Sequence, residues 1–321
     1  MKRTLIFILK LLIMGVVFIF VGVKFAQTWH TVSLERLHID WPIVALIPLG
    51  MLALSAVNAL TWLWLARSMG DRHAVVPLLG AYTFSQAGKY VPGKVLLVLL
   101  RLERTHRVGM EREVCLLSTA LENGMYALSG ALVGVMALLV VARNHPLYIV
   151  LCALLILLLL GIFHPRVFFT LLNLALKSMK RGPIPPGRRF RRRHMAIAVV
   201  LFCGSWLGGG LALWAAVRCV HALAPQDWFM LCGIFALSVS LGMFSLLPGG
   251  LGVRDAVQAL MLMPVVHSPE LIIVAVAMLR LWQIAVELLL ALVGGVVNVR
   301  WTGSASGGAF GDRAEVAGSD A

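Results

Sequence analysis

Charged residues are scarce in this chain, and acidic ones are the scarcest. Among 321 residues, Asp and Glu number 14 and Lys and Arg number 28, so charged residues make up 13% against 60% hydrophobic ones. Soluble domains are about a quarter charged and roughly half apolar. The mean hydropathy of +0.92 and several continuous apolar windows of membrane-crossing length therefore predict an all-α polytopic membrane protein. A β-barrel would show alternating rather than continuous apolar segments.

The chain also lacks the motifs of most enzymes. Its five cysteines form no C-x-x-C pair, which argues against a disulfide framework or a zinc site. No two of its six aspartates stand close enough for the Asp-x-Asp clamp of many sugar transferases, and no H-x-x-x-H, G-x-S-x-G or P-loop occurs. We therefore expect no catalytic residues, no metal and no cofactor.

The basic residues are concentrated in a few loops. The net charge is +14, and the loop 164–194 carries nine Lys and Arg without a single acid. In a membrane protein such loops lie on the cytoplasmic side beside anionic lipid, so nucleic acid is not an expected partner. We expect an inner-membrane protein with a transmembrane domain over 1–301, both ends in the cytoplasm, and a small polar tail at 302–321 that is disordered.

Six full transmembrane helices are predicted, and the first is a retained span rather than a signal peptide. Their approximate bounds are 5–26, 42–66, 113–141, 147–163, 195–219 and 271–298.

Two further apolar regions, 74–102 and 229–264, are each interrupted by Pro-Gly. Proline removes a backbone donor, and in lipid every freed polar group needs another partner. We expect both regions to be re-entrant, the first from the cytoplasmic side and the second from the outer side, although 229–247 alone almost reaches the length of a span.

The two broken regions stand in similar places in the two halves of the chain. Pro92 precedes Glu122 by 30 residues, and Pro248 precedes Arg280 by 32. Broken segments in corresponding positions of two halves indicate an inverted repeat and a transporter's binding site. Coincidence is the alternative, because Pro-Gly kinks occur in many membrane helices.

Both breaks have the composition of an anion site. After Pro248, the glycines permit left-handed turns and close backbone approach. A helix beginning near Val253 then presents free N–H groups and a positive dipole end, to which Arg254 adds a full charge. Asp255 is the residue that could cap this helix or orient Arg254. Basic residues flank the first break in the same way, and a phosphate is the anion that we expect near a membrane.

Polar residues inside the predicted spans share helix faces. Ser118, Glu122, Tyr126 and Ser129 form one stripe, and Arg280, Gln283 and Glu287 form another. Arg280 and Glu287 lie two turns apart, so each is expected to find a partner on another helix, since a buried charge needs one. Glu122 is the candidate partner for Arg280. The alternative is that the Arg280 guanidinium binds an anionic headgroup.

Four stretches resemble the lysylphosphatidylglycerol synthase transmembrane-region family, also called flippase-like. They are GKYVPGKVLLVLLR, STALENGMYALSG, LLPGGLGVRDAVQALML and the helix of Arg280, in the order seen in the family. The resemblance covers nearly the whole chain and implies a protein that handles lipids or lipid-linked sugars. Members include proteins linked to hopanoid synthesis and envelope glycan assembly. The chain has no room for an aminoacyl-transferase domain, so aminoacyl transfer is not expected.

The leading hypothesis is a lipid translocase that works without ATP hydrolysis. The alternative is a membrane-embedded glycosyltransferase, or its accessory subunit, acting on polyprenyl-phosphate; a third is a scaffold that recruits cytosolic biosynthetic enzymes through 177–193. Anionic membrane lipids are the expected partners. The predicted substrate-binding residues are Lys89, Tyr90, Pro92, Gly93, Lys94, Arg101, Glu122, Pro248, Gly249, Gly250, Gly252, Arg254, Asp255, Arg280, Gln283 and Glu287.

Overall fold

The structure is a computed structural model that describes residues 41–90, 95–141, 146–178, 182, 184, 192–245, 248–250 and 252–316. The predicted first span at 5–26 lies outside these residues, as do Pro92, Gly93, Lys94 and the residues 179–181, 183 and 185–191 of the basic loop.

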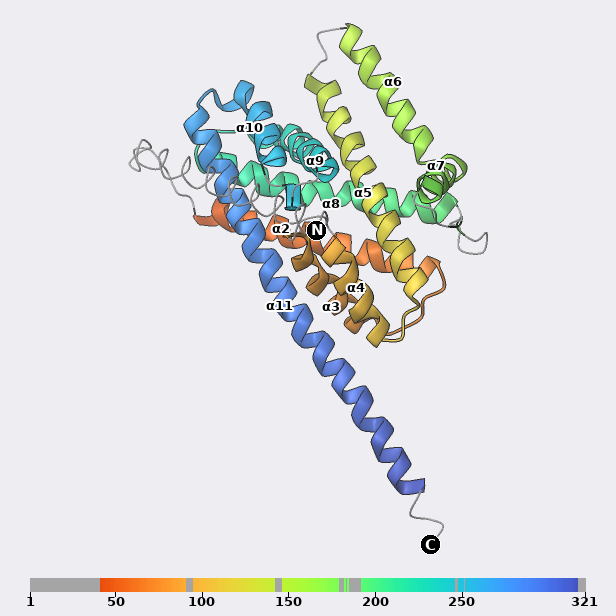
Figure 1. Ribbon diagram of the computed structural model, residues 1–321. Helices are drawn as coiled ribbons and strands as arrows, with labels where there is room; N and C mark the ends of the chain where they lie inside the picture. The colour runs from red at the N-terminus through yellow and green to blue at the C-terminus, as the bar shows by residue number, and fades with distance from the viewer. Residues whose placement is uncertain are drawn as a thin grey trace, which may run out of the picture.

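Every element in the described part of the chain is a helix, and no strand occurs there (Figure 1). The elements are α2 (Trp41–Ser68), α3 (Val75–Ser85), η2 (Gln86–Tyr90), α4 (Val95–Arg107), α5 (Arg112–Val141), α6 (Pro146–Ile162), α7 (Pro165–Ser178), α8 (Arg192–Arg218), η4 (Pro225–Asp227), α9 (Trp228–Phe244), η5 (Pro248–Gly250), α10 (Val253–Val266) and α11 (Pro269–Val316), where η denotes a 3-10 helix.

Five helical segments within the described ranges are long and apolar enough to cross a membrane. They are α2, α5 (Arg112–Leu139), α8, η4 with α9 (Pro225–Phe244) and the first part of α11 (Pro269–Trp301). The all-α polytopic class is therefore confirmed, together with the predicted spans 42–66, 113–141, 195–219 and 271–298.

The predicted span 147–163 corresponds to helix α6, which forms a bent pair with α7. Helix α6 has only 17 residues and reaches span length only together with α7, to which it is bent by 77°. Pro165, at the first position of α7, starts a new helix direction, as proline does at a helix N-terminus. Helix α7 occupies the start of the basic loop 164–194, and one of its faces is apolar: Phe168 and Phe169 are buried. The sequence did not predict this helix, because the many basic residues of 164–194 indicated a loop.

The second broken region has two unequal arms. Pro225 begins η4 directly before α9, so the first arm reaches 20 residues and span length. The second arm, α10, has 14 residues and is too short to cross the hydrocarbon core. The segment 229–247, which alone almost reached the length of a span, is therefore part of a helix of span length, and α10 packs back against that helix.

The two broken regions share one layout and meet in space. Each consists of a helix, a 3-10 turn near the Pro-Gly pair and a second helix. The turns η2 and η5 contact each other, and a Cβ atom placed on Gly249 would lie 3.6 Å from the ring of Tyr90. This contact fits the predicted inverted repeat, which itself stays a prediction.

Helix α11 is the longest element and extends away from the bundle in Figure 1. It continues to Val316, whereas the composition predicted a disordered tail over 302–321. No proline interrupts this helix after Pro269, so its backbone hydrogen bonding is not broken.

The periphery and the centre of the bundle differ in packing. Among the described elements, helix α6 contacts only α5 and α7 extensively, and most of its apolar side chains are exposed, as expected of a surface that faces lipid. At the centre, the backbones of α2 and α8 approach each other closely at Gly50 and Gly208. A Cβ atom on Gly208 would lie 2.7 Å from the carbonyl oxygen of Gly50. Only glycine permits this approach.

Replacing Gly208 with alanine is expected to destabilise the protein by about 1–3 kcal/mol, because the α2 and α8 backbones must separate. Gly204→Ala is the matched control on the same helix, since a Cβ atom there meets nothing within 4 Å. It should leave stability equal or slightly raised, because alanine favours a helix over glycine. Thermal unfolding of both variants in detergent measures the difference, and equal melting temperatures would contradict the packing argument.

Candidate functional site

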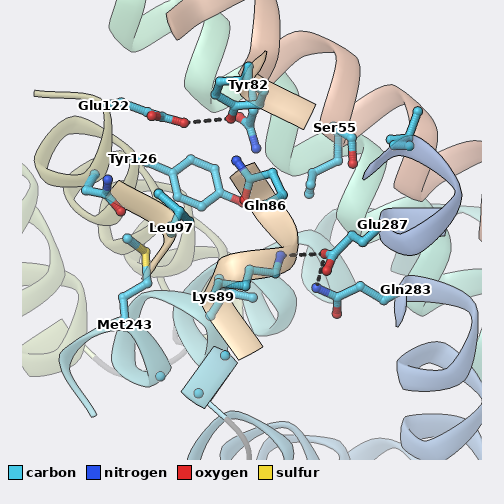
Figure 2. A pocket seen from close by; sticks show the side chains of 18 of the residues that line it. Ser55, Tyr82, Gln86, Lys89, Leu97, Glu122, Tyr126, Met243, Gln283 and Glu287 are labelled. Carbon is cyan, nitrogen blue, oxygen red and sulfur yellow. Dashed lines mark hydrogen bonds and ion pairs between the residues drawn. The ribbon is translucent and has the colours of Figure 1, made fainter. Parts of the chain in front are cut away.

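A cavity of about 170 Å³ lies where the two breaks meet. Helices α2, α3, α4, α5, α9, α10 and α11 line it together with η2 and η5. The polar and charged side chains around it are Ser55, Asn58, Tyr82, Thr83, Gln86, Lys89, Arg101, Glu122, Asn123, Tyr126, Arg254, Gln283 and Glu287. Figure 2 shows Glu122 with Tyr82 in one part of this cavity and Lys89, Gln283 and Glu287 in another.

Both carboxylate oxygens of Glu122 have partners within the protein. The Tyr82 hydroxyl donates to its Oε1 at 2.6 Å, and the Arg101 guanidinium forms an ion pair with its Oε2. Arg101 also donates to Ser85 at 3.1 Å and to Thr119 at 3.3 Å, and it lies over the Tyr82 ring at 4.2 Å. Its charge is thus compensated inside the protein, although Arg101 is only 1% exposed.

The predicted ion pair between Glu122 and Arg280 is wrong. Helix α5 faces α4 in this region, so Glu122 meets Arg101 rather than a residue of α11. Arg101 was predicted to bind an anion at the first break, but its guanidinium is already occupied by Glu122. Arg280 instead donates to the carbonyl oxygen of Gly249 at 3.2 Å.

Glu287 joins the first break to α11. Lys89 lies 2.6 Å from its Oε1, the Tyr90 hydroxyl donates to its Oε2, and the Gln283 amide donates to Oε1 at 2.8 Å. Lys89 and Tyr90 belong to η2, nearly 200 positions away along the chain. The prediction that Arg280 and Glu287 do not satisfy each other is confirmed, since each has other partners.

Gln283 links Glu287 to two arginines. Its amide oxygen accepts from Arg254 at 2.7 Å and from Arg280 at 3.3 Å. Asp255 is the carboxylate nearest to Arg280 among the ion pairs of the described residues, at 3.6 Å from Nε. The amide of Gln283 is neutral, so it satisfies hydrogen bonds of both guanidinium groups without compensating their charge.

Arg254 stands out among the charged residues of the cavity. It is 4% exposed, its guanidinium lies 4.7 Å from the Phe235 ring centroid, and its Nε has no hydrogen-bond partner. In the part of the chain that the structure describes, no carboxylate forms an ion pair with it. A buried cation without a counter-charge is costly, so this position favours an added anion.

The second break has the backbone that its glycines predicted. Gly249, Gly250 and Gly252 adopt positive φ angles of 57°, 68° and 80°. Helix α10 then begins at Val253 as expected, and the Asp255 carboxylate accepts from the Gly252 N–H at 3.1 Å. Asp255 therefore caps the helix start and lies beside Arg280, and it does not pair with Arg254.

The polar stripe of α5 is used in two ways. Glu122 and Tyr126 line the cavity, and Tyr126 stacks on Trp206 with ring centroids 4.1 Å apart. Ser129 accepts from the Trp206 indole at 3.0 Å, while Ser118 donates to the backbone of its own helix. Of the two serines, Ser129 thus joins α5 to α8.

Sequence reasoning missed several cavity residues. Tyr82 and Gln86 lie four positions apart in the apolar region directly before the first break, and that spacing was a usable signal. Asn58 and Phe235 gave none, since each is a single residue in a long apolar helix. Among the described residues, no group of three His, Cys, Asp or Glu side chains could hold a metal ion.

Comparison with known proteins gives one family. The family model described as the lysylphosphatidylglycerol synthase TM region matches residues 7–294, which is most of the chain. No curated protein matches the sequence.

The Glu122–Arg101 pair yields a double-mutant test. Glu122→Gln alone leaves Arg101 buried without a counter-charge and is expected to cost about 3–5 kcal/mol of stability. The combined change Glu122→Gln with Arg101→Gln should recover a large part of that loss in thermal unfolding. Glu103→Gln is the control, because its pair with Arg107 is half exposed and should matter by less than about 1 kcal/mol. Additive losses in the double variant would show that the two residues are independent.

Proposed function

Because the chain belongs to the lysylphosphatidylglycerol synthase transmembrane-region family, and so is a multi-pass membrane protein related to lipid handling, we propose that it moves an anionic phospholipid between leaflets. It does so without ATP hydrolysis and acts as a transporter rather than an enzyme. The membrane is the inner membrane, with the basic loop 164–194 and both ends on the cytoplasmic side.

Arg254 is the observation that carries this proposal. It lines the cavity, is almost fully buried, bonds to a neutral amide and lies over an aromatic ring, and it forms no ion pair with a carboxylate of the described residues. A phosphate entering beside it would supply the missing negative charge. Charge-assisted hydrogen bonds from a guanidinium to phosphate are among the stronger ones in proteins.

Backbone N–H groups of the second break lie beside the Arg254 side chain and add to the proposed site. Helix α10 starts one residue before Arg254, and the first turn of a helix carries free N–H groups and the positive end of the dipole. Gly249 and Gly250 line the cavity just before this start, where small residues allow a close approach. Together these groups form an anion site of the kind found at helix N-termini.

The size of the cavity suits a headgroup and not a whole lipid. Its volume of about 170 Å³ lies below the range of about 300–1,000 Å³ typical of sites that enclose a drug-sized ligand. In our proposal the headgroup enters the cavity between the two breaks, while the acyl chains stay in the bilayer. Hydrogen bonds from Arg254 and the backbone N–H groups then replace part of the hydration that the phosphate loses.

Arg254→Gln is expected to slow phosphatidylglycerol movement at least tenfold, because it removes a charge-assisted hydrogen bond worth about 1.5–3 kcal/mol. The measurement is a leaflet-resolved assay of labelled phosphatidylglycerol in liposomes that contain the purified protein and no sugar donor. The absence of a donor separates translocation from the glycosyltransferase alternative.

Arg193→Gln is the matched control, since it removes the same charge from an exposed position of α8 outside the cavity. It should leave the rate unchanged. Normal transport by Arg254→Gln, or a loss explained entirely by lower abundance of that variant, would refute the phosphate site.

A further inference from the structure

Both carboxylates of the cavity are already neutralised. Glu122 and Glu287 are the only acids among the described lining residues. Glu122 is paired with Arg101, and Glu287 is paired with Lys89 and held by two further hydrogen bonds. An ammonium group entering the cavity would therefore find no carboxylate that is free to bind it.

The cations are in excess around Gln283. Lys89, Arg254 and Arg280 stand against two carboxylates, those of Glu287 and Asp255. Arg254 and Arg280 share the amide oxygen of one glutamine, so the excess is concentrated at that point. An additional cation here would be repelled, whereas a single negative charge would balance the set.

The rest of the cavity lining combines apolar side chains with uncharged polar groups. Ser55, Asn58, Gln86, Asn123 and Tyr126 supply hydroxyls and amides that both donate and accept. The buried Asn58 Oδ1 has no hydrogen-bond partner, so it is an acceptor available to a ligand. In Figure 2, Gln86 and Tyr126 lie near the centre of the cavity, between Glu122 and Glu287. Such groups match hydroxyls better than charges.

Resting on the function proposed above, we infer that the cavity selects a phospholipid whose phosphate carries an uncharged, hydroxyl-bearing group, such as glycerol or a sugar. It discriminates against headgroups that carry an ammonium. The phosphate lies beside Arg254, and the hydroxyls face the neutral amides. This selectivity is opposite to that of a site for a lysyl headgroup, which needs unpaired carboxylates.

Two labelled lipids test the selectivity in liposomes containing the full-length protein. Phosphatidylglycerol should move at least ten times faster than lysylphosphatidylglycerol, which adds two ammonium groups to the same glycerol. Binding is measured separately as the rise in melting temperature with the short-chain dihexanoyl forms of the two lipids, in detergent. The phosphatidylglycerol form should stabilise the protein at a concentration at least ten times lower.

Gln283→Glu gives the sharper test, since it places a third carboxylate between the two arginines without changing the side-chain shape. The preference for phosphatidylglycerol should fall at least tenfold, in transport or in binding. Gln226→Glu makes the same chemical change at an exposed position outside the cavity and should leave the preference intact. If Gln283→Glu does not fold, Arg254→Gln should lower the preference in the same direction in the binding measurement.

The outcomes separate selectivity from function. Equal or faster movement of lysylphosphatidylglycerol in the wild-type protein would overturn the selectivity and leave lipid translocation standing. Selective stabilisation by dihexanoyl phosphatidylglycerol without any movement would support the selectivity and overturn translocation. Neither movement nor stabilisation by either lipid would overturn both.

Discussion

Charge compensation inside a medium of low dielectric constant is the constraint on which this structure depends. Each ionised side chain drawn into the bundle loses its hydration and must find an opposite charge or a set of hydrogen bonds. Glu122 with Arg101 and Glu287 with Lys89 meet this requirement within the protein. Arg254 does not, among the described residues, and the proposed function follows from that difference.

The same constraint explains why the two broken regions meet. A helix interrupted in lipid leaves N–H and C=O groups that need partners, and another interrupted helix can supply them together with polar side chains. Here Arg280 of α11 donates to the carbonyl oxygen of Gly249, while Lys89 and Tyr90 of the first break reach Glu287 on the same helix. Helix α11 thus ties both breaks together through one face, on which Gln283 lies between the arginines and the carboxylate.

The network also defines where change is tolerated. Gln283 is neutral and is bonded to three charged residues, so a change of its charge would change the net charge of this part of the cavity. The Glu122 network is self-contained, with donors from α3 and α4 around one carboxylate of α5. We regard the Glu122 end as the structural anchor of the cavity and the Gln283 end as the part that meets the ligand.

The sequence by itself determined the class of the protein, most of the spans and the position of both breaks. Membrane spans must be long and apolar, so Pro-Gly pairs and ionised residues within them are easy to identify in the sequence. Glu122, Arg254, Arg280 and Glu287 could therefore be predicted as site residues. Their partners could not be recognised, because pairing depends on which helix faces which. Because α4 packs against α5, Glu122 pairs with Arg101. Because η2 packs against α11, Lys89 pairs with Glu287 across almost 200 residues. With both carboxylates paired in this way, Arg254 bonds to the amide of Gln283 and not to a carboxylate of the described residues. Only the tertiary structure decides these pairings, because sequence spacing carries no information about contacts between distant helices.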